Sequence, residues 1–92
     1  MNPKKLATQQ IIITKAHGDF ERGLGNYALS KISNKMLSDE LVQDTFIKTW
    51  SYLVKGGEII LMKAFLYHVL NDLIIDEYRK RKTTSLLRHS IF

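Results

Sequence analysis

The stretch MKAFLYHVLNDLI, residues 62–74, decides the fold class, because its apolar residues recur every three or four positions. This spacing places them on one face of an α-helix, whereas a half-buried strand would alternate apolar and polar residues. The residues that form this face are Met62, Phe65, Leu66, Val69, Leu70, Leu73 and Ile74. Lysines and arginines follow as far as Lys82, and positive charge suits the C-terminal end of a helix. The pattern predicts a helix over about residues 61–82.

The N-terminal third of the chain predicts two further helices. The first spans about residues 5–16 and is expected to break at Gly18, with Asp19 as the N-cap of the second. The apolar stripe of the second helix consists of Phe20, Leu24, Tyr27, Ala28 and Ile32. Gly23 and Gly25 each weaken a helix by up to about 1 kcal/mol relative to alanine. They either allow close helix packing or are simply tolerated, and the sequence favours neither explanation.

A third helix is predicted after a break at residues 34–37. Ser38 is the expected N-cap, which puts Asp39 and Glu40 in the first turn, where acids complement the helix dipole. The apolar stripe of this helix consists of Leu41, Val42, Phe46, Trp50 and Leu53. The pair Gly56-Gly57 is expected to end it, since glycine adopts the left-handed conformation at low cost.

These elements predict an all-α fold, a compact bundle of three to four helices in a single domain. Pro3 is the one proline among the 92 residues, and neither strand-like alternation nor an internal repeat is present. We expect residues 1–8 to be a flexible N-terminus and residues 9–83 to form the helical domain. Residues 84–92 have no clear period and are expected to be a tail or the start of an interdomain linker.

The composition argues against several classes of protein. The chain has no cysteine, which excludes disulfides and thiolate metal sites and fits a cytoplasmic protein. It has no glycine-rich phosphate loop and no His-Glu-x-x-His motif, and its three histidines are too far apart to share a helix face. No apolar run is long enough for a signal peptide or a membrane span. We therefore expect no enzyme, catalytic residue, metal, cofactor or membrane partner.

The net charge of +5 is compatible with a polyanionic partner, and the charges are unevenly distributed. Residues 79–82 are four consecutive cations, whereas Asp39, Glu40 and Asp44 cluster in the middle of the chain. This separation suggests two surfaces for two different partners.

One of these surfaces lies on the predicted third helix. Its residues Glu40, Gln43, Asp44 and Ile47 are spaced by three and four positions and therefore lie side by side, away from the apolar stripe. An exposed isoleucine beside acids suits docking of a basic helix. If only the spacing of these residues is considered, an ordinary solvated helix face is the simpler explanation.

The other surface combines aromatic and basic residues on the predicted fourth helix. The residues concerned are Lys63, Tyr67, Asn71, Tyr78, Arg79 and Lys82. Bases of single-stranded nucleic acid stack on aromatic rings while Lys and Arg contact the phosphates. Alternatively, the tyrosines are half-buried boundary residues and the cations solubilise a helix end, and periodicity does not decide between these explanations.

Three stretches in a fixed order add a family resemblance. They are AHGDFE (16–21), SDELVQDTFIKTW (38–50) and KAFLYHVL (63–70), the last continuing into IDEYRKRK (75–82). Together they resemble region 2 of extracytoplasmic-function sigma factors of the sigma-70 family, over about residues 9–85. The most specific part is the acidic-Leu-Val-Gln-acidic-Thr-Phe core that ends at Trp50.

The resemblance implies a transcription initiation factor domain with two binding surfaces. Glu40, Gln43, Asp44 and Ile47 would contact the coiled coil of the β′ clamp of core RNA polymerase. The loop at residues 56–60 resembles the specificity loop that receives a base flipped from the non-template strand of the promoter −10 element. An anti-sigma factor is a further possible partner.

The resemblance also implies which residues contact single-stranded promoter DNA. The base-flipping site would be lined by Gly57, Glu58, Lys63, Tyr67, His68 and Asn71. The backbone phosphates would be held by Arg79, Lys80, Arg81 and Lys82, without reading sequence.

Two departures from the family stand out. Family members often have asparagine where this chain has Asp72, and an acid facing DNA would repel phosphate. Family members also continue into a helix-turn-helix domain that reads the −35 element, and no such sequence follows here, so we expect an excised domain or a shortened protein.

The alternative function is an interaction module or decoy that binds an anti-sigma factor or polymerase without recognising promoters. A third hypothesis, a helix bundle that binds a membrane surface, is supported only by the basic charge and the apolar stripes.

Overall fold

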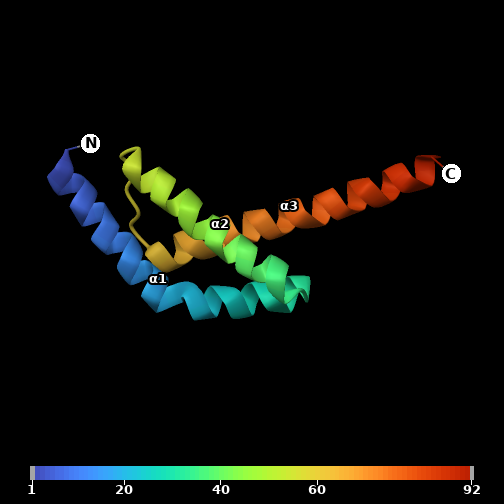
Figure 1. Cartoon of the computed structure of the whole chain (residues 1–92), viewed down its shortest axis with the longest axis horizontal. Helices are drawn as coiled ribbons and strands as arrows, with labels where there is room; N and C mark the ends of the chain where they lie inside the picture. Colours follow the sequence, from blue (N-terminus) through green and yellow to red (C-terminus); the bar gives the residue numbers. More distant parts are fainter. Residues whose placement is uncertain (1, 92) are drawn as a thin grey trace.

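The computed structural model describes the backbone of residues 2–91 and the side chains of residues 2–81. It contains α1 (Pro3–Ile32), α2 (Lys35–Val54) and α3 (Met62–Ile91), which all contact one another (Figure 1). The described residues form no strand. The prediction of an all-α bundle is confirmed, with three helices because the first two predicted helices are one.

The prediction of a break at Gly18 is wrong, because α1 is continuous from Pro3 to Ile32. Its first turn is capped by Asn2, whose Oδ1 accepts a hydrogen bond from the Lys5 amide at 2.8 Å. The backbone of residues 3–8, predicted to be a flexible N-terminus, therefore belongs to the helix. Figure 1 shows that α1 bends near its middle without being interrupted.

The continuity of α1 has a packing reason. Its inward residues Ala16, Phe20, Leu24, Ala28 and Ile32 follow one another at intervals of four, so a single stripe crosses Gly18. A break would leave backbone groups unsatisfied at two new helix ends, whereas one glycine costs only about 1 kcal/mol. Asp19 is consequently not an N-cap but an exposed mid-helix residue, paired with Lys15 at 2.9 Å.

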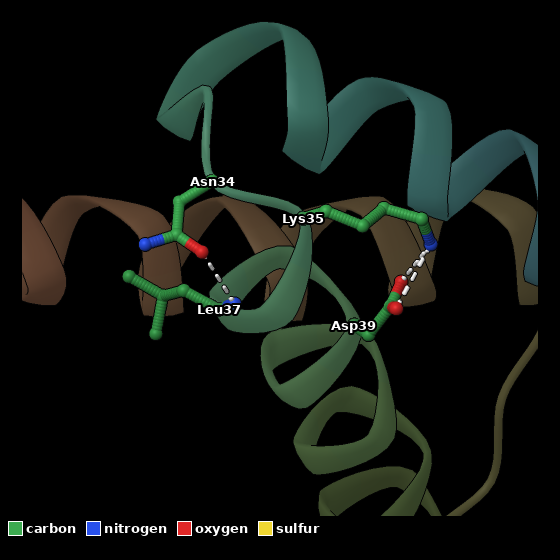
Figure 2. A network of polar contacts seen from close by, with 4 residues as sticks. All are labelled: Asn34, Lys35, Leu37 and Asp39. Atoms are coloured by element: carbon green, nitrogen blue, oxygen red, sulfur yellow. Dashed lines mark hydrogen bonds and ion pairs between the residues drawn. The ribbon is translucent and has the colours of Figure 1, made fainter.

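Two residues connect α1 to α2. Ser33 adopts the left-handed conformation (φ 58°) and its amide donates to the Leu29 carbonyl at 2.8 Å. Asn34 is the N-cap of α2, because its Oδ1 accepts from the Leu37 amide at 3.1 Å (Figure 2). In the same first turns, Lys35 pairs with Asp39 at 2.7 Å.

The prediction that Ser38 caps α2 is therefore wrong. Ser38 lies one turn inside the helix and is only 1% exposed, so Asp39 and Glu40 are not in the first turn. Asn34 and Ser38 are both residue types that cap helices well. The sequence alone placed the helix start one turn too late.

The predicted apolar stripes form the core. Its buried hydrophobic residues are Ala16, Leu24, Ala28, Ile32, Leu41, Val42, Phe46, Leu53, Leu66, Leu70 and Ile74. Phe20, Tyr27 and Trp50, which were predicted to face inward, are half-buried. The sequence pattern missed two buried threonines of α2, Thr45 and Thr49. Their hydroxyls donate to the carbonyls of Leu41 and Thr45, at 2.9 and 2.8 Å.

The C-terminal end of α2 confirms the predicted role of Gly56-Gly57. Gly56 has φ +96° and its amide donates to the Leu53 carbonyl, while the Gly57 amide donates to the Tyr52 carbonyl at 2.9 Å. These two bonds form a Schellman motif, which requires the left-handed residue that glycine provides. A Cβ on Gly57 would overlap the Tyr52 ring, so the loop leaves α2 in one fixed direction.

The third helix is longer than predicted. It continues past Lys82 to Ile91, so the backbone of the predicted tail is helical. Its C-terminal half extends beyond the other two helices (Figure 1), and the molecule measures 58 × 25 × 20 Å. The radius of gyration of 16.0 Å exceeds the roughly 12 Å of a compact domain of this length. No helix in the described part of the chain is both long and apolar enough to span a bilayer.

Candidate functional site

The outer face of α2 carries acids that form no ion pair with any described side chain. Glu40 and Gln43 are exposed, Asp44 is half-buried, and Ile47, one turn further along the helix, is 64% exposed. Among the described residues, Glu40 and Asp44 have no ion-pair partner, unlike Asp39, which is paired with Lys35. The four predicted residues therefore do lie together, as an acidic surface around one large apolar side chain.

A groove of about 880 Å³ lies beside this acidic surface, between α1 and α2. Gln43 and Ile47 line it and so belong to both features. Its other lining residues are His17, Gly18, Glu21, Arg22, Gly25, Asn26, Leu29, Lys35, Asp39, Val42 and Phe46. The sequence analysis missed the α1 side of the groove. Its residues recur at intervals of four on one helix face, but the chain was expected to break at Gly18.

Two glycines keep the α1 side of this groove open. A Cβ added to Gly18 or Gly25 would meet no atom of the protein within 4 Å. Neither glycine is therefore needed for packing inside the bundle. Gly18 had been predicted to break the helix, and Gly25 had been left without an explanation. Gly23 differs, because a Cβ there would lie 2.7 Å from the Tyr67 hydroxyl.

The predicted base-binding loop contacts α2 through Tyr52. The Tyr52 hydroxyl donates to the Glu58 carbonyl at 3.3 Å, and the Tyr52 ring lies 5.0 Å from that of Phe65 on α3. The Glu58 side chain is exposed, whereas Gly57 is half-buried under Tyr52. Ile60, 93% exposed, is an apolar group in this loop that the site prediction did not include.

Tyr67 and Asn71 face α1. The Tyr27 hydroxyl donates to Asn71 Oδ1 at 3.0 Å, and the rings of Tyr27 and Tyr67 pack edge to face at 5.5 Å. Further along the same interface, the Tyr78 hydroxyl donates to the Lys31 carbonyl. We call Tyr27, Tyr67 and Asn71 the tyrosine seam. Tyr67 is half-buried there, as the boundary interpretation of the tyrosines expected, while Asn71 stays exposed.

The remaining predicted nucleic-acid residues are exposed along α3. Lys63 lies in its first turn, and His68 Nε2 is 3.4 Å from an oxygen of Asp72 one turn later. Arg79, Lys80 and Arg81 are exposed, with Arg81 Nε 3.9 Å from Glu77, and the side chain of Lys82 lies outside the described residues.

The predicted DNA residues thus form two groups, along α3 and in the loop that precedes it. The loop, Lys63, Tyr67, His68 and Asn71 form the group at the N-terminal end of α3, and the cations begin at Arg79, twelve residues after Tyr67. Twelve residues correspond to about 18 Å along a helix. An extended single strand can bridge that length, which a compact small-molecule ligand cannot.

The described residues contain no group of three or more side chains that could hold a metal ion. Comparison of the chain with protein-family models, with curated proteins and with solved structures finds no match.

Proposed function

We propose that this chain is a transcription initiation domain that docks on core RNA polymerase through α2 and binds the non-template strand of the promoter −10 element through α3. It acts in the cytoplasm as a specificity factor and not as an enzyme. Its polymerase contact is the coiled coil of the β′ clamp. The three motif stretches suggest this function, and the unneutralised acidic surface of α2 is the observation that carries it.

The acidic surface supports docking for an electrostatic reason. Glu40 and Asp44 remain without an ion-pair partner in the described structure, and Ile47 is largely exposed beside them. A basic helical partner would neutralise both acids while covering the isoleucine. Such complementarity raises the association rate and selects the partner.

The surface of α3 supports binding of a single strand. The loop bonded to Tyr52 and several exposed polar groups lie at one end, and exposed cations lie about 18 Å further along. Cations that contact phosphates supply affinity without sequence preference, and the loop end would supply base contacts. The net charge of +5 favours the same partner.

The docking proposal is tested by reversing the two acids. The double substitution Glu40→Lys, Asp44→Lys should weaken binding to core RNA polymerase at least tenfold, because two attractive contacts become repulsive. Binding is measured by biolayer interferometry without DNA, and folding is checked by circular dichroism. The matched control is Asp72→Lys with Asp76→Lys, which changes the net charge equally on α3.

The control variant should bind polymerase like the wild type. Wild-type affinity of a folded Glu40→Lys, Asp44→Lys variant would contradict the docking proposal. Equal loss in both variants would show that only net charge matters, and would also contradict it.

The decoy function is a second candidate, favoured by one observation. Tyr67 and Asn71 are engaged with α1, so part of the predicted base site is already in use within the bundle. A decoy would bind polymerase or an anti-sigma factor and ignore DNA. Fluorescence anisotropy with a labelled −10 non-template oligonucleotide at low salt separates the two, because a decoy gives no binding.

A further inference from the structure

The side chain of Asn71 is oriented by a residue of another helix. Its Oδ1 accepts the hydrogen bond from Tyr27 at 3.0 Å, and its amide nitrogen has no partner among the described residues. Asn71 is nevertheless exposed. Tyr27 occupies one of the two lone pairs of Oδ1, whereas the amide nitrogen, which can only donate hydrogen bonds, keeps both of its hydrogens available to a ligand.

The orientation is maintained because Tyr27 itself is held in place. Its ring packs on the Tyr67 ring at 5.5 Å, and the Lys31 Nζ lies 5.6 Å from its centroid. Gly23 provides the space into which the Tyr67 hydroxyl fits. Tyr67 and Lys31 thus contact the phenol that binds Asn71, and Gly23 accommodates Tyr67.

A reversed carboxamide would be less favourable at this position. The amide nitrogen would then face the Tyr27 oxygen, and the phenol would have to find another acceptor for its own hydrogen. The described residues offer it none. Because this bond is exposed, water can accept from the phenol instead, so the observed orientation is favoured by about the net contribution of one hydrogen bond.

We propose that Tyr27 is a positioning residue that makes Asn71 select bases by their hydrogen-bond acceptors. A base with a carbonyl at its pairing edge, such as O4 of uracil or thymine, accepts from the outward amide. A base with an amino group there, such as N4 of cytosine, presents a donor to a donor and is disfavoured. This inference rests on the proposed single-strand binding and assigns a role to a residue of α1 that the sequence did not indicate.

The test compares oligodeoxyuridine with oligodeoxycytidine of equal length by fluorescence anisotropy. At the pairing edge these bases differ in the carbonyl or amino group at position 4 and in the protonation of N3. The wild-type chain should prefer uridine about fivefold, the effect of one net hydrogen bond. Tyr27→Phe keeps the ring but removes the hydroxyl, so the carboxamide can reverse and the preference should fall to less than about twofold.

The matched control is Tyr78→Phe. It also removes a hydroxyl that joins α3 to α1, through the Lys31 carbonyl, but it does not touch Asn71. If the α1–α3 hydrogen bonds only stabilised the fold, the two variants would show the same change in uridine preference. The inference requires Tyr78→Phe to keep the uridine preference.

A substitution at the exposed position 71 covers the case in which Tyr27→Phe perturbs the fold. Asn71→Asp keeps the acceptor for Tyr27 and replaces the outward donor by an acceptor, so the preference should reverse towards cytidine. The new carboxylate repels the phosphates of both oligonucleotides equally, so this effect cancels in the ratio of the two affinities.

The outcomes separate the inference from the function on which it rests. If the wild-type chain binds neither oligonucleotide at low salt, the proposed strand binding fails and the inference fails with it. If the chain binds both equally, or if Tyr27→Phe keeps the full preference, strand binding stands and the role of Tyr27 is overturned.

Discussion

At the scale of single residues, Asn34 and Ser38 show that two residues one helical turn apart can have different structural roles. Asn34 accepts a hydrogen bond from the backbone at the start of α2, whereas Ser38 is buried and its hydroxyl has no hydrogen-bond partner among the residues that the structure describes. A buried hydroxyl without a partner retains its desolvation cost. The two residues should therefore respond in opposite ways to the same substitution.

We expect Asn34→Ala to lower the free energy of unfolding by about 1 kcal/mol, because the amide of Leu37 loses its cap. Ser38→Ala should leave this free energy unchanged or raise it by up to about 1 kcal/mol, because it removes an unsatisfied hydroxyl. Urea denaturation followed by circular dichroism measures both values. A loss of about 1 kcal/mol for Ser38→Ala would mean that Ser38 is the N-cap after all.

The sequence could not separate these residues, because both belong to the types that cap helices. The signal that favours Asn34 lies in the core, where Ser38 continues the buried face of α2 together with Val42, Thr45 and Thr49. That face contains small polar residues, and a search for apolar residues therefore passes over it.

At the scale of the helices, the glycines of α1 have different reasons to be there. Gly23 makes room for the Tyr67 hydroxyl, which would lie 2.7 Å from a Cβ at that position. Gly25, only two residues away, has open space around the same point. Of the two explanations that the sequence left open, close packing therefore applies to Gly23 and not to Gly25.

We expect Gly25→Ala to raise the free energy of unfolding by up to about 1 kcal/mol, because alanine favours the helix and meets no atom. Gly23→Ala should lower the free energy of unfolding or leave it unchanged. Tyr67 has to shift to make room for the Cβ, and this offsets the higher helix propensity of alanine. Thermal and urea unfolding of both variants checks this contrast. Equal stabilisation by both substitutions would show that Gly23 has no packing role.

The periodicity of apolar residues was sufficient to predict the buried faces of the helices, but not where α1 ends. Gly18 and Asp19 resemble a helix end and a helix start when they are considered alone. The four-residue spacing from Ala16 to Phe20 and on to Leu24 indicates one uninterrupted helix. Tertiary packing of that stripe outweighs the local preference for a break.

At the scale of the whole molecule, the sequence predicted which residues are exposed better than it predicted what they contact. Spacing placed Glu40, Gln43, Asp44 and Ile47 on one surface, and they do lie together there. The hydrogen bond between Tyr27 and Asn71 joins residues 44 positions apart. No spacing rule within one helix predicts such a contact, because it depends on how α3 crosses α1.

The two-residue connection at Ser33 and Asn34 also has a consequence for the time course of folding. Bringing α1 against α2 closes almost no loop and costs little chain entropy, whereas the Tyr78–Lys31 bond joins residues 47 apart. We expect the α1–α2 hairpin to be largely formed in the folding transition state, and α3 to dock on α1 afterwards.

Phe46→Leu, which weakens the contact with His17 between α1 and α2, should then slow refolding in stopped-flow experiments. Tyr78→Phe should mainly accelerate unfolding, and equal slowing of refolding by both variants would refute this order. When the native state opens transiently, we expect these contacts to separate in the reverse order. The interface that orients Asn71 would be the first to separate, while the hairpin that carries the acidic surface persists.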